Sequence, residues 1–558
     1  MTHYACLFEA KSIQEYILRS GRLRHIVGAS ELIDSLTGAM LDNVFRELKV
    51  KEAVNGEVRC SRRAGGAIYL FTDDQNKRDA FRDLWALVVR QYAPGLSFIM
   101  ANGEGKNDFE AYQAAKKQLE TMRNRQPPAL PAGTPVTRYS SRTGLPASSR
   151  HSKLGLQDAA SEQFGQDVFW KRGSLVQRFA PDSKSTDWPR ELEYDPDGEL
   201  GSVEFPFLPD NRYLGLLHAD GNGLGQVLIN LTAYIKQHPE NFIAVFRDFS
   251  NAIQTATTAA ANAATVAVLT KARTPHINSN DGVYPARPIV LGGDDLTLLI
   301  RADLALKFTE EFLTAFEVKT EEQLKELRKR YPQITALPEK LTAGAGIAFV
   351  KSSHPFYMTM ELTEGLAKFA KNCAKDCAKQ HKTNEHQPNE RIPPTVAFYR
   401  VTTASHGDYR DVREQELTFC GDPHPIVTSL GAYGVDPQPF GLPALADVQA
   451  LAKVFAKEDV ARGPARQLLT LIGQDVDDAR RRYARWRDVM KNRAPATLND
   501  IDDLLTKLCG KLKDDLPVSD AINKDNAHIT PLADLATLLT LGKTPTPPAD
   551  QSQETRNA

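Results

Sequence analysis

Three aspartates in two short motifs are the residues of this sequence best suited to chemistry. Asp220 ends an apolar run in the segment HADGNGLG, and Asp294 and Asp295 stand together in LGGDD. Carboxylate oxygens are the ligands that Mg²⁺ and Mn²⁺ prefer. Two such ions about 4 Å apart can hold the attacking and leaving oxygens when a 3′-hydroxyl attacks an α-phosphate. We therefore take Asp220, Asp294 and Asp295 as candidate metal ligands and catalytic residues.

Glycines beside these aspartates suit a turn that binds phosphate. The candidate nucleotide-binding glycines are Gly221, Gly223 and Gly225 after the first aspartate and Gly292 and Gly293 before the other two. A glycine has no β-carbon, so backbone N–H groups can approach a phosphate closely. The ordinary alternative is that Asp-Gly and Gly-Gly-Asp-Asp are common turn sequences. Adjacent carboxylates at a hairpin tip repel each other unless a cation binds, which favours the functional interpretation.

The elements that must position the aspartates follow from the pattern of apolar residues. Residues 285–300 are two apolar runs joined by Gly-Gly-Asp-Asp, which is typical of a tight β-hairpin. The other expected elements are a strand, glycine-rich turn and helix start at 212–228, a helix at about 239–272, a strand at 341–350, a helix at 358–380 and a strand at 395–401. This order predicts a ferredoxin-like β-α-β-β-α-β unit, with the hairpin beside the strand of Asp220.

The beginning of the chain repeats this order, which indicates an internal duplication. The expected elements are a strand at 3–10, one or two helices at 11–41, a hairpin at 62–74, a strand at 96–101 and a helix at 108–125. Aligning the hairpins sets Gly65-Gly66-Ala67-Ile68 against Gly292-Gly293-Asp294-Asp295, so the first copy lacks both carboxylates. We interpret the first copy as the degenerate partner of a catalytic second copy.

The whole chain is expected to be an α+β protein with two ferredoxin-like domains. The segments are a degenerate first copy (1–125), an inserted loop-rich subdomain (126–205), the catalytic copy (206–425), a C-terminal helical domain (426–540) and a disordered tail (541–558). The insert is rich in Pro and Ser with little periodicity. The helical domain alternates apolar and charged residues at helical spacing, and the tail has the composition of a disordered segment.

Three basic residues are candidates for binding a nucleotide. Lys371 lies on the helix expected after the strand at 341–350, from which a lysine can reach a triphosphate. Arg22 and Arg24 precede a Gly-Ala-Ser turn, where a second nucleotide could bind between the two copies. The alternative for all three is a solvated charge on a helix surface. The sequence contains neither a His-Asp dipeptide nor a Walker-type phosphate loop.

Composition excludes several classes of protein. The 558 residues carry 69 Lys+Arg against 70 Asp+Glu, so the overall charge gives no support to a dedicated nucleic-acid binder. Six irregularly placed cysteines do not form a disulfide pattern. We find no signal peptide and no stretch approaching the ~18 apolar residues of a membrane span. A cytoplasmic location without membrane contact is therefore expected.

The chain resembles the large polymerase-like, or palm-domain, subunit of type III CRISPR effector complexes, which is related to nucleotidyl cyclases. The similar segments include IQEYILRSGRLRHIVGASELIDSL, RTGLPA, LHADGNGLG, LGGDDLTLLI and AGAGIAFVKSSHPFYMTMELTEGLAKFAK. The resemblance implies two packed palm domains that convert ATP into cyclic oligoadenylate messengers for antiviral defence. It implies that Asp220, Asp294 and Asp295 bind two Mg²⁺ or Mn²⁺ ions. It also implies that Gly292 and Gly293 admit the nucleotide and that Lys371 is a phosphate-side lysine.

This sequence departs from that family at three places. Residue 4 already enters the first palm, so we expect no N-terminal histidine-aspartate nuclease domain and no DNA cleavage. The insert around RYSSRTGLPASSRHSKLG lacks the cysteines of the family's zinc element, and Asn222 stands where an acidic residue is frequent. Three alternatives therefore remain open beside cyclic oligoadenylate synthesis. They are a cyclic dinucleotide product, a stand-alone cyclase using another nucleotide, and a non-catalytic scaffold that binds CRISPR RNA, target RNA and other effector subunits.

Overall fold

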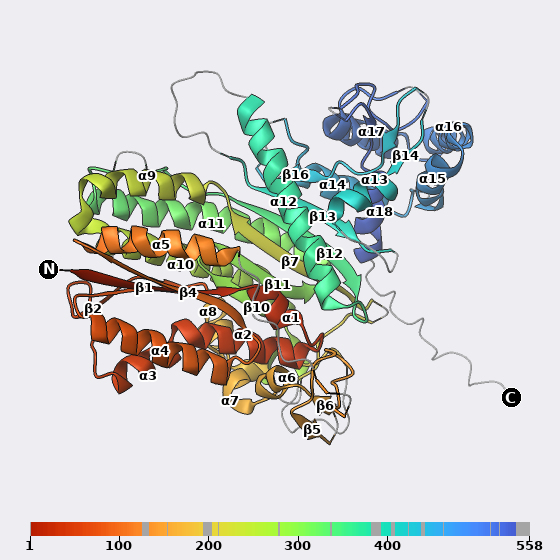
Figure 1. The fold of residues 1–558 in the computed structure, drawn as a ribbon. Coiled ribbons are helices and arrows are strands. Elements are labelled where there is room, and N and C mark those ends of the chain that lie inside the picture. Colours follow the sequence, from red (N-terminus) through yellow and green to blue (C-terminus); the bar gives the residue numbers. More distant parts are fainter. Residues whose placement is uncertain are drawn as a thin grey trace.

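The computed structural model places two similar α/β halves side by side and a helical region at one end (Figure 1). It describes residues 2–124, 133–134, 136–152, 154–193, 203–209, 211–276, 279–334, 337–380, 392–402, 408–421, 423–436, 441–460, 462–513, 515–523 and 525–542. The expected disordered tail lies, from residue 543 onward, outside the described residues. The five segment boundaries expected from the sequence remain proposals.

The first half is a four-stranded sheet with helices on its faces. Its elements are β1 (His3–Lys11), α1 (Ile13–Leu18), α2 (Leu23–Thr37), α3 (Ala39–Glu47), β2 (Val58–Ala64), β3 (Ala67–Thr72), α4 (Gln75–Tyr92), β4 (Ser97–Gly105) and α5 (Asp108–Arg123). The strand order is β2-β3-β1-β4, and each neighbouring pair is antiparallel. This is the ferredoxin-like arrangement, so the fold predicted for this copy is confirmed.

The second half repeats that sheet and extends it. Its elements are β7 (Tyr213–Gly221), α9 (Leu224–Gln237), α10 (Phe242–Ala264), β8 (Thr274–His276), β9 (Ser279–Val283), β10 (Ala286–Gly292), β11 (Asp295–Arg301), α11 (Ala302–Arg330), β12 (Ala343–Lys351), α12 (Phe356–Gln380) and β13 (Thr395–Arg400). The order β10-β11-β7-β12 matches β2-β3-β1-β4 of the first half, and β13 and β16 (Ala432–Gly434) add two further strands.

One element of the second half corrects the order expected from the sequence. The sequence analysis did not predict a helix between the hairpin and the strand at 341–350, but α11 fills that interval with 29 residues. The helix α11 is thus the second helix of the ferredoxin-like unit, and α12 and β13 follow the unit as an extension. The apolar face of α11 was missed because its spacing is diluted by many charged residues.

The segment between the halves contains short elements that pack on both of them. They are β5 (Ser149–His151), β6 (Gly155–Gln157), α6 (Ala159–Phe164), α7 (Asp167–Trp170) and α8 (Ser174–Phe179). The carboxylate of Glu31, on α2, accepts hydrogen bonds from the backbone N–H groups of Ser174 and Leu175 at the first turn of α8. Because α8 also packs on α10 and β10, it joins the first half to the second.

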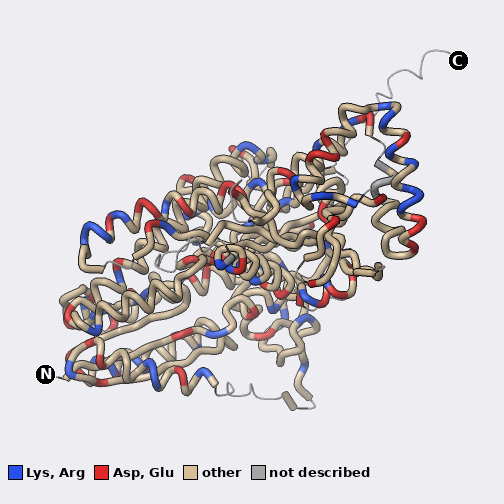
Figure 2. The backbone as a smooth tube through the Cα atoms, turned by 90° about the horizontal axis from the view of Figure 1, so that it is seen from above, with Lys and Arg blue, Asp and Glu red and all other residues tan. Residues whose placement is uncertain are grey.

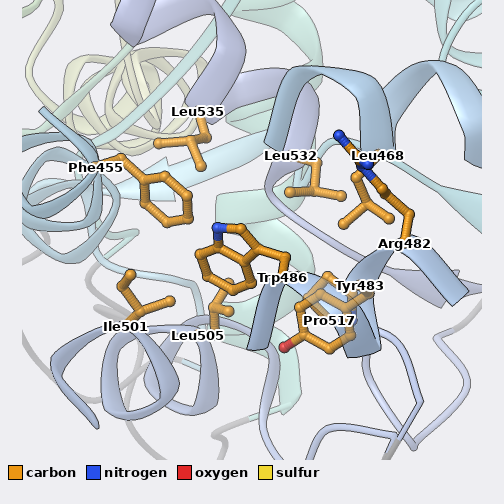
Figure 3. Close-up of a pocket in the computed structure, with 10 residues that line it drawn as sticks. All are labelled: Phe455, Leu468, Arg482, Tyr483, Trp486, Ile501, Leu505, Pro517, Leu532 and Leu535. Carbon is orange, nitrogen blue, oxygen red and sulfur yellow. The ribbon is translucent and has the colours of Figure 1, made fainter. Parts of the chain in front are cut away.

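A helical region follows the second half. Its elements are α13 (Tyr409–Gln415), β14 (Thr418–Phe419), β15 (Ile426–Val427), α14 (Leu445–Phe455), α15 (Arg462–Gln474), α16 (Val476–Arg493), α17 (Pro495–Cys509), β17 (His528–Ile529) and α18 (Leu532–Leu541). Figure 3 shows Trp486 of α16 among apolar side chains from several of these helices, including Phe455 and Leu535. The pocket there holds about 20 Å³, on the order of one water molecule, so it is a packing gap in a core.

The two halves share one apolar core. Phe242, on α10 of the second half, packs against Phe71 and Phe109 of the first half with ring centroids 5.4 and 5.5 Å apart. Phe71 and Phe242 are fully buried. Lys and Arg are interspersed with Asp and Glu over the described parts of the chain (Figure 2). Within the described ranges, every helix is too short or too polar to cross a membrane.

Candidate active site

Asp220, Asp294 and Asp295 converge at one edge of the second sheet. Asp220 lies near the end of β7, Asp295 begins β11, and Asp294 lies in the turn between β10 and β11. One carboxylate oxygen from each of the three lies within 4.8 Å of the others. All three side chains are partly exposed, so they are accessible from solvent. Three hard oxygen donors at this spacing suit Mg²⁺ or Mn²⁺.

The hairpin predicted from Gly-Gly-Asp-Asp is confirmed. Gly292 pairs with Asp295, and Gly293 adopts φ 63° in the two-residue turn between them. This positive φ is one that side-chain-bearing residues rarely adopt, so the turn requires glycine at position 293. The hairpin thus directs two consecutive aspartates toward the end of β7.

Two partly buried hydrogen bonds fix the hairpin to its surroundings. The hydroxyl of Thr257, on α10, donates to the carbonyl oxygen of Gly293 at 2.7 Å. The guanidinium of Arg178, on α8, donates to the carbonyl oxygen of Leu291 at 2.8 Å and also binds Asp34 of α2. Sequence reasoning missed both residues, because neither stands in a motif and both act across long sequence separations.

The glycines after Asp220 have different surroundings. A β-carbon on Gly221 would lie 2.4 Å from Cδ1 of Leu224 and 2.9 Å from Oδ2 of Asp294, so glycine leaves room for both side chains. Gly223 adopts φ 78° before the first turn of α9. Gly225 is exposed, and a β-carbon there would meet no atom within 4 Å. Their binding of phosphate stays a prediction.

Asn222 has a structural role in this turn. Its side chain is 3% exposed and donates to the hydroxyl of Thr342 at 3.0 Å, while its backbone N–H donates to the carbonyl oxygen of Thr342 at 2.7 Å. Thr342 immediately precedes β12. Asn222 therefore ties the turn after β7 to the neighbouring strand, which explains why a neutral side chain is tolerated here.

Lys371 reaches the aspartates from α12. Its ammonium binds Oδ2 of Asp220 and donates to the carbonyl oxygen of Gly221 at 2.9 Å. Burial acts to raise the pKa of Asp220, but the hydrogen bond and charge of Lys371 outweigh it and lower that pKa. The position predicted for Lys371, beside the site, agrees with the structure, and its contact with phosphate stays a prediction.

The other two carboxylates are pushed toward their protonated forms. Burial, followed by the hydrogen bond and negative charge of Asp220, raises the pKa of Asp294. Burial and the charges of Asp294 and Asp220 raise the pKa of Asp295. Like charges this close cannot all ionise without a compensating cation. The electrostatics thus favour binding of a divalent ion, which would release protons.

The register of the two sheets corrects the alignment of the hairpins by one residue. Ala64 pairs with Ala67 across the first turn, as Gly292 pairs with Asp295 across the second. Asp294 therefore corresponds to Gly66 and Asp295 to Ala67, rather than to Ala67 and Ile68. The inference that the first hairpin lacks both carboxylates is unchanged. Aligning the two Gly-Gly pairs gives the wrong register, because Gly65 and Gly66 both lie in the first turn whereas Gly292 still pairs with Asp295 across the second.

The same register identifies the counterpart of Asp220. Glu9 pairs with Ala67 between β1 and β3. Leu296 pairs with Ala219 between β11 and β7, which sets Asp295 opposite Asp220 in the next position. Glu9 therefore occupies the place of Asp220 in the first half. Its carboxylate is bound by the guanidinium of Arg123 and the hydroxyl of Tyr69.

A cavity of about 340 Å³ lies between the halves and borders Asp295. Its lining comes from α2 and the first hairpin on one side and from the second hairpin on the other; it includes Ser30, Asp34, Gly66, Arg178, Gln254 and Gly292. The polar side chains give the cavity hydrogen-bond donors and acceptors, and the glycines leave its backbone groups accessible. A cavity of this size suits a small ligand such as a nucleotide.

Arg22 and Arg24 do not line this cavity. Arg22 precedes α2 and Arg24 lies in its first turn, whereas the residues of α2 that line the cavity begin at Ser30. The Nε atom of Arg24 lies 3.5 Å from Glu191 of the connecting segment. The structure gives these two arginines no contact with the three aspartates, and their binding of a nucleotide stays a prediction.

A second group of metal-type donors belongs to a salt bridge. His3, Asp73 and Asp108 offer donor atoms close to one another. The guanidinium of Arg59 lies among them, 2.7 Å from Asp73 and 2.8 Å from Asp108. Because a fixed cation already compensates both carboxylates, this group holds β2 and α5 together and is not a metal centre.

Comparison with known protein families gave a match to part of this chain. Residues 213–379 match the family described as Cas10/Cmr2, second palm domain. A comparison with curated protein sequences found no match. Among solved structures, the Csm1-Csm4 cassette in complex with cA4 covers 97% of this chain and 69% of its own, with 12% identity and a TM-score of 0.46.

Two further structures are similar over the same shares, 97% of this chain and 69% of theirs. Csm1 in T. onnurineus has 13% identity and a TM-score of 0.43, and the Csm1-Csm4 cassette in complex with one ATP has 12% and 0.43. The family match covers β7, the hairpin and α12, which carry all three aspartates and Lys371. The predicted resemblance is supported for this part of the chain: residues 213–379 match the second palm domain of the Cas10/Cmr2 family.

Proposed function

We propose that this chain is a nucleotidyltransferase that joins ATP molecules into cyclic oligoadenylate or cyclic dinucleotide messengers in type III CRISPR antiviral defence. The observation that carries the proposal is the convergence of Asp220, Asp294 and Asp295 within 4.8 Å beside a 340 Å³ cavity. The match of this segment to the second palm domain of Cas10/Cmr2 supports it.

The proposed cofactors are two Mg²⁺ or Mn²⁺ ions. The donors fit them, because all are carboxylate oxygens, they repel one another in the absence of a cation, and Gly221 leaves space for the carboxylate of Asp294. Asp220, Asp294 and Asp295 would hold the ions. When bound, divalent ions lower the pKa of the attacking hydroxyl and neutralise charge on the phosphates.

The chain's own residues would orient the nucleotides. The hairpin and the turn after Asp220 present open backbone to the phosphates, and the cavity between the halves would receive a second ATP. In each transfer, a 3′-hydroxyl oxygen bonds to the α-phosphorus of the other nucleotide and its proton passes to solvent. The bond from that phosphorus to the bridging oxygen breaks, and pyrophosphate leaves. A final transfer within one product closes the ring.

We propose that the chain binds other type III effector subunits and is regulated by CRISPR RNA or target RNA, as a component of an effector complex. The solved Csm1-Csm4 cassettes are two-protein assemblies. A purely scaffolding role is the alternative class, and retention of two adjacent, mutually repelling aspartates argues against it.

The test is synthesis by the purified full chain. We expect ATP with Mn²⁺ or Mg²⁺ to give a cyclic adenylate identified by mass, with or without added target RNA. The double variant Asp294→Ala/Asp295→Ala should give none. Absence of product under every RNA condition, together with defence that survives the double substitution, would reject the enzyme and favour the scaffold. Co-purified RNA would distinguish a complex subunit from a stand-alone synthase.

A further inference from the structure

Each half of the molecule holds a cation against the acid near the end of its first strand. In the first half, Arg123 ends α5 and binds Glu9 of β1; in the second half, Lys371 of α12 binds Asp220 of β7. Both cations come from the helix that follows the fourth strand of their sheet. The two ion pairs are therefore counterparts within the duplication.

The two pairs differ in how firmly the cation is held. Nη2 of Arg123 lies 2.8 and 2.6 Å from the two oxygens of Glu9, Nε lies 3.2 Å from one of them, and the hydroxyl of Tyr69 adds a bond of 2.5 Å. The planar guanidinium of Arg123 therefore contacts both carboxylate oxygens of Glu9. Lys371 binds one oxygen of Asp220 through a compact ammonium on a flexible stem.

A glycine makes room for the stem of Lys371. Gly344, on β12, lies opposite Asp220 in the sheet, and a β-carbon there would be 2.4 Å from Cγ of Lys371. Any larger residue would displace the stem and its ammonium. The fold thus leaves space for a lysine to rest on the strand beside the aspartates.

We infer that Lys371 is an exchangeable counter-ion that competes with a divalent metal for Asp220, an inference that rests on the proposed metal site. Without metal, the three carboxylates need a cation, and Lys371 supplies one charge. A divalent ion held by the three aspartates would supply more charge and would compete with the ammonium for the carboxylate of Asp220. In the first half, Gly66 and Ala67 replace the other two acids, and Arg123 pairs with the single remaining carboxylate.

This exchange would couple metal binding to nucleotide binding. A lysine released from Asp220 has a free ammonium beside the phosphate-binding turn, whereas one held by Asp220 does not. Metal and nucleotide would then each favour binding of the other, by the reciprocity of linked equilibria. Lys371 would thus regulate the metal site as well as contact phosphate.

Metal binding without turnover tests this inference. Mn²⁺ affinity of the full chain would be measured by calorimetry or electron paramagnetic resonance, in the absence of nucleotide. We expect Lys371→Met to strengthen Mn²⁺ binding about tenfold, equivalent to ~1.4 kcal/mol. Lys371→Arg should weaken it, because a guanidinium would bind Asp220 as Arg123 binds Glu9. Lys375→Met, which changes an exposed lysine one turn further along the same helix, is the matched control and should change nothing.

A second variant covers the case in which Lys371→Met does not fold. Gly344→Ala keeps every charge but displaces the lysine stem, so it should also strengthen Mn²⁺ binding. Thermal unfolding in EDTA checks that each variant is folded. Unchanged or weaker Mn²⁺ binding in folded Lys371→Met or Gly344→Ala overturns the exchange. If the unsubstituted chain binds no Mn²⁺ at all, the proposed metal site itself fails; if it binds Mn²⁺ and only the variants behave contrary to expectation, that site stands and the exchange alone fails.

Discussion

Asp294 lies directly over Gly221. A β-carbon at position 221 would be 2.9 Å from Oδ2 and 3.0 Å from Cβ of Asp294. The close approach exists because the turn after β7 and the β10–β11 hairpin meet at the same edge of the sheet. It makes the spacing of the three carboxylates depend on a missing side chain.

Gly221→Ala should therefore displace Asp294 and weaken metal binding. We expect Mn²⁺ affinity to fall at least about tenfold, because a carboxylate moved by roughly 1 Å no longer shares an ion with its neighbours. Gly225→Ala is the control, since a β-carbon there meets no atom within 4 Å. Equal affinities in the two variants would show that the position of Asp294 does not depend on Gly221.

Asp295→Asn should raise the stability of the metal-free protein while abolishing its binding of metal. The substitution keeps the shape but removes a partly buried charge that its neighbours repel, so the metal-free protein should gain about 1 kcal/mol in free energy of unfolding at pH 8. Product formation and Mn²⁺ binding should both be lost. Denaturant unfolding in EDTA measures the first effect. A destabilised metal-free variant would contradict the repulsion inferred among the three carboxylates.

Stability without metal should decrease as pH rises. Burial and neighbouring charge raise the pKa of Asp294 to about 6 and that of Asp295 to about 8, so the folded chain holds protons that the unfolded chain releases above about pH 4. Because the folded state binds more protons than the unfolded state between about pH 4 and pH 8, the free energy of unfolding falls as pH rises through this range. The increase in melting temperature caused by Mg²⁺ should accordingly be larger near pH 8 than near pH 6. An increase that shrinks toward pH 8 would contradict this linkage.

Thr257→Val should loosen the hairpin without removing a metal ligand. Valine matches threonine in shape but leaves the carbonyl oxygen of Gly293 without its 2.7 Å hydrogen bond, at a cost of about 1–2 kcal/mol. We expect weaker Mn²⁺ binding as well as lower stability. Thr309→Val is the control, since its buried hydroxyl bonds only to the carbonyl oxygen of Ala305 within α11. If both variants bind Mn²⁺ like the parent, Thr257 has no positioning role.

Sequence reasoning predicted the elements whose signals are local. Alternating apolar runs around Gly-Gly-Asp-Asp predicted the hairpin, and repetition of the same order predicted two ferredoxin-like halves. It missed α11 entirely, because the helix is long and highly charged, and it placed the hairpin alignment one residue out of register. Strand register is set by which residues face each other across neighbouring strands. An alignment of residue types along the chain does not contain that information.

The amino-acid sequence by itself determined which residues could do chemistry: two adjacent aspartates after two glycines, a third after a strand, and their loss in the first copy. Only the tertiary structure decided that these three carboxylates meet, that Lys371 joins them, and that Glu9 survives as the partner of Arg123. It also decided that Thr257 and Arg178 hold the hairpin and that Arg22 and Arg24 lie away from the cavity. The reason is physical: residue type sets the charge and ligand chemistry of a side chain, whereas distances between side chains far apart in sequence are set by strand register and by packing of the two halves.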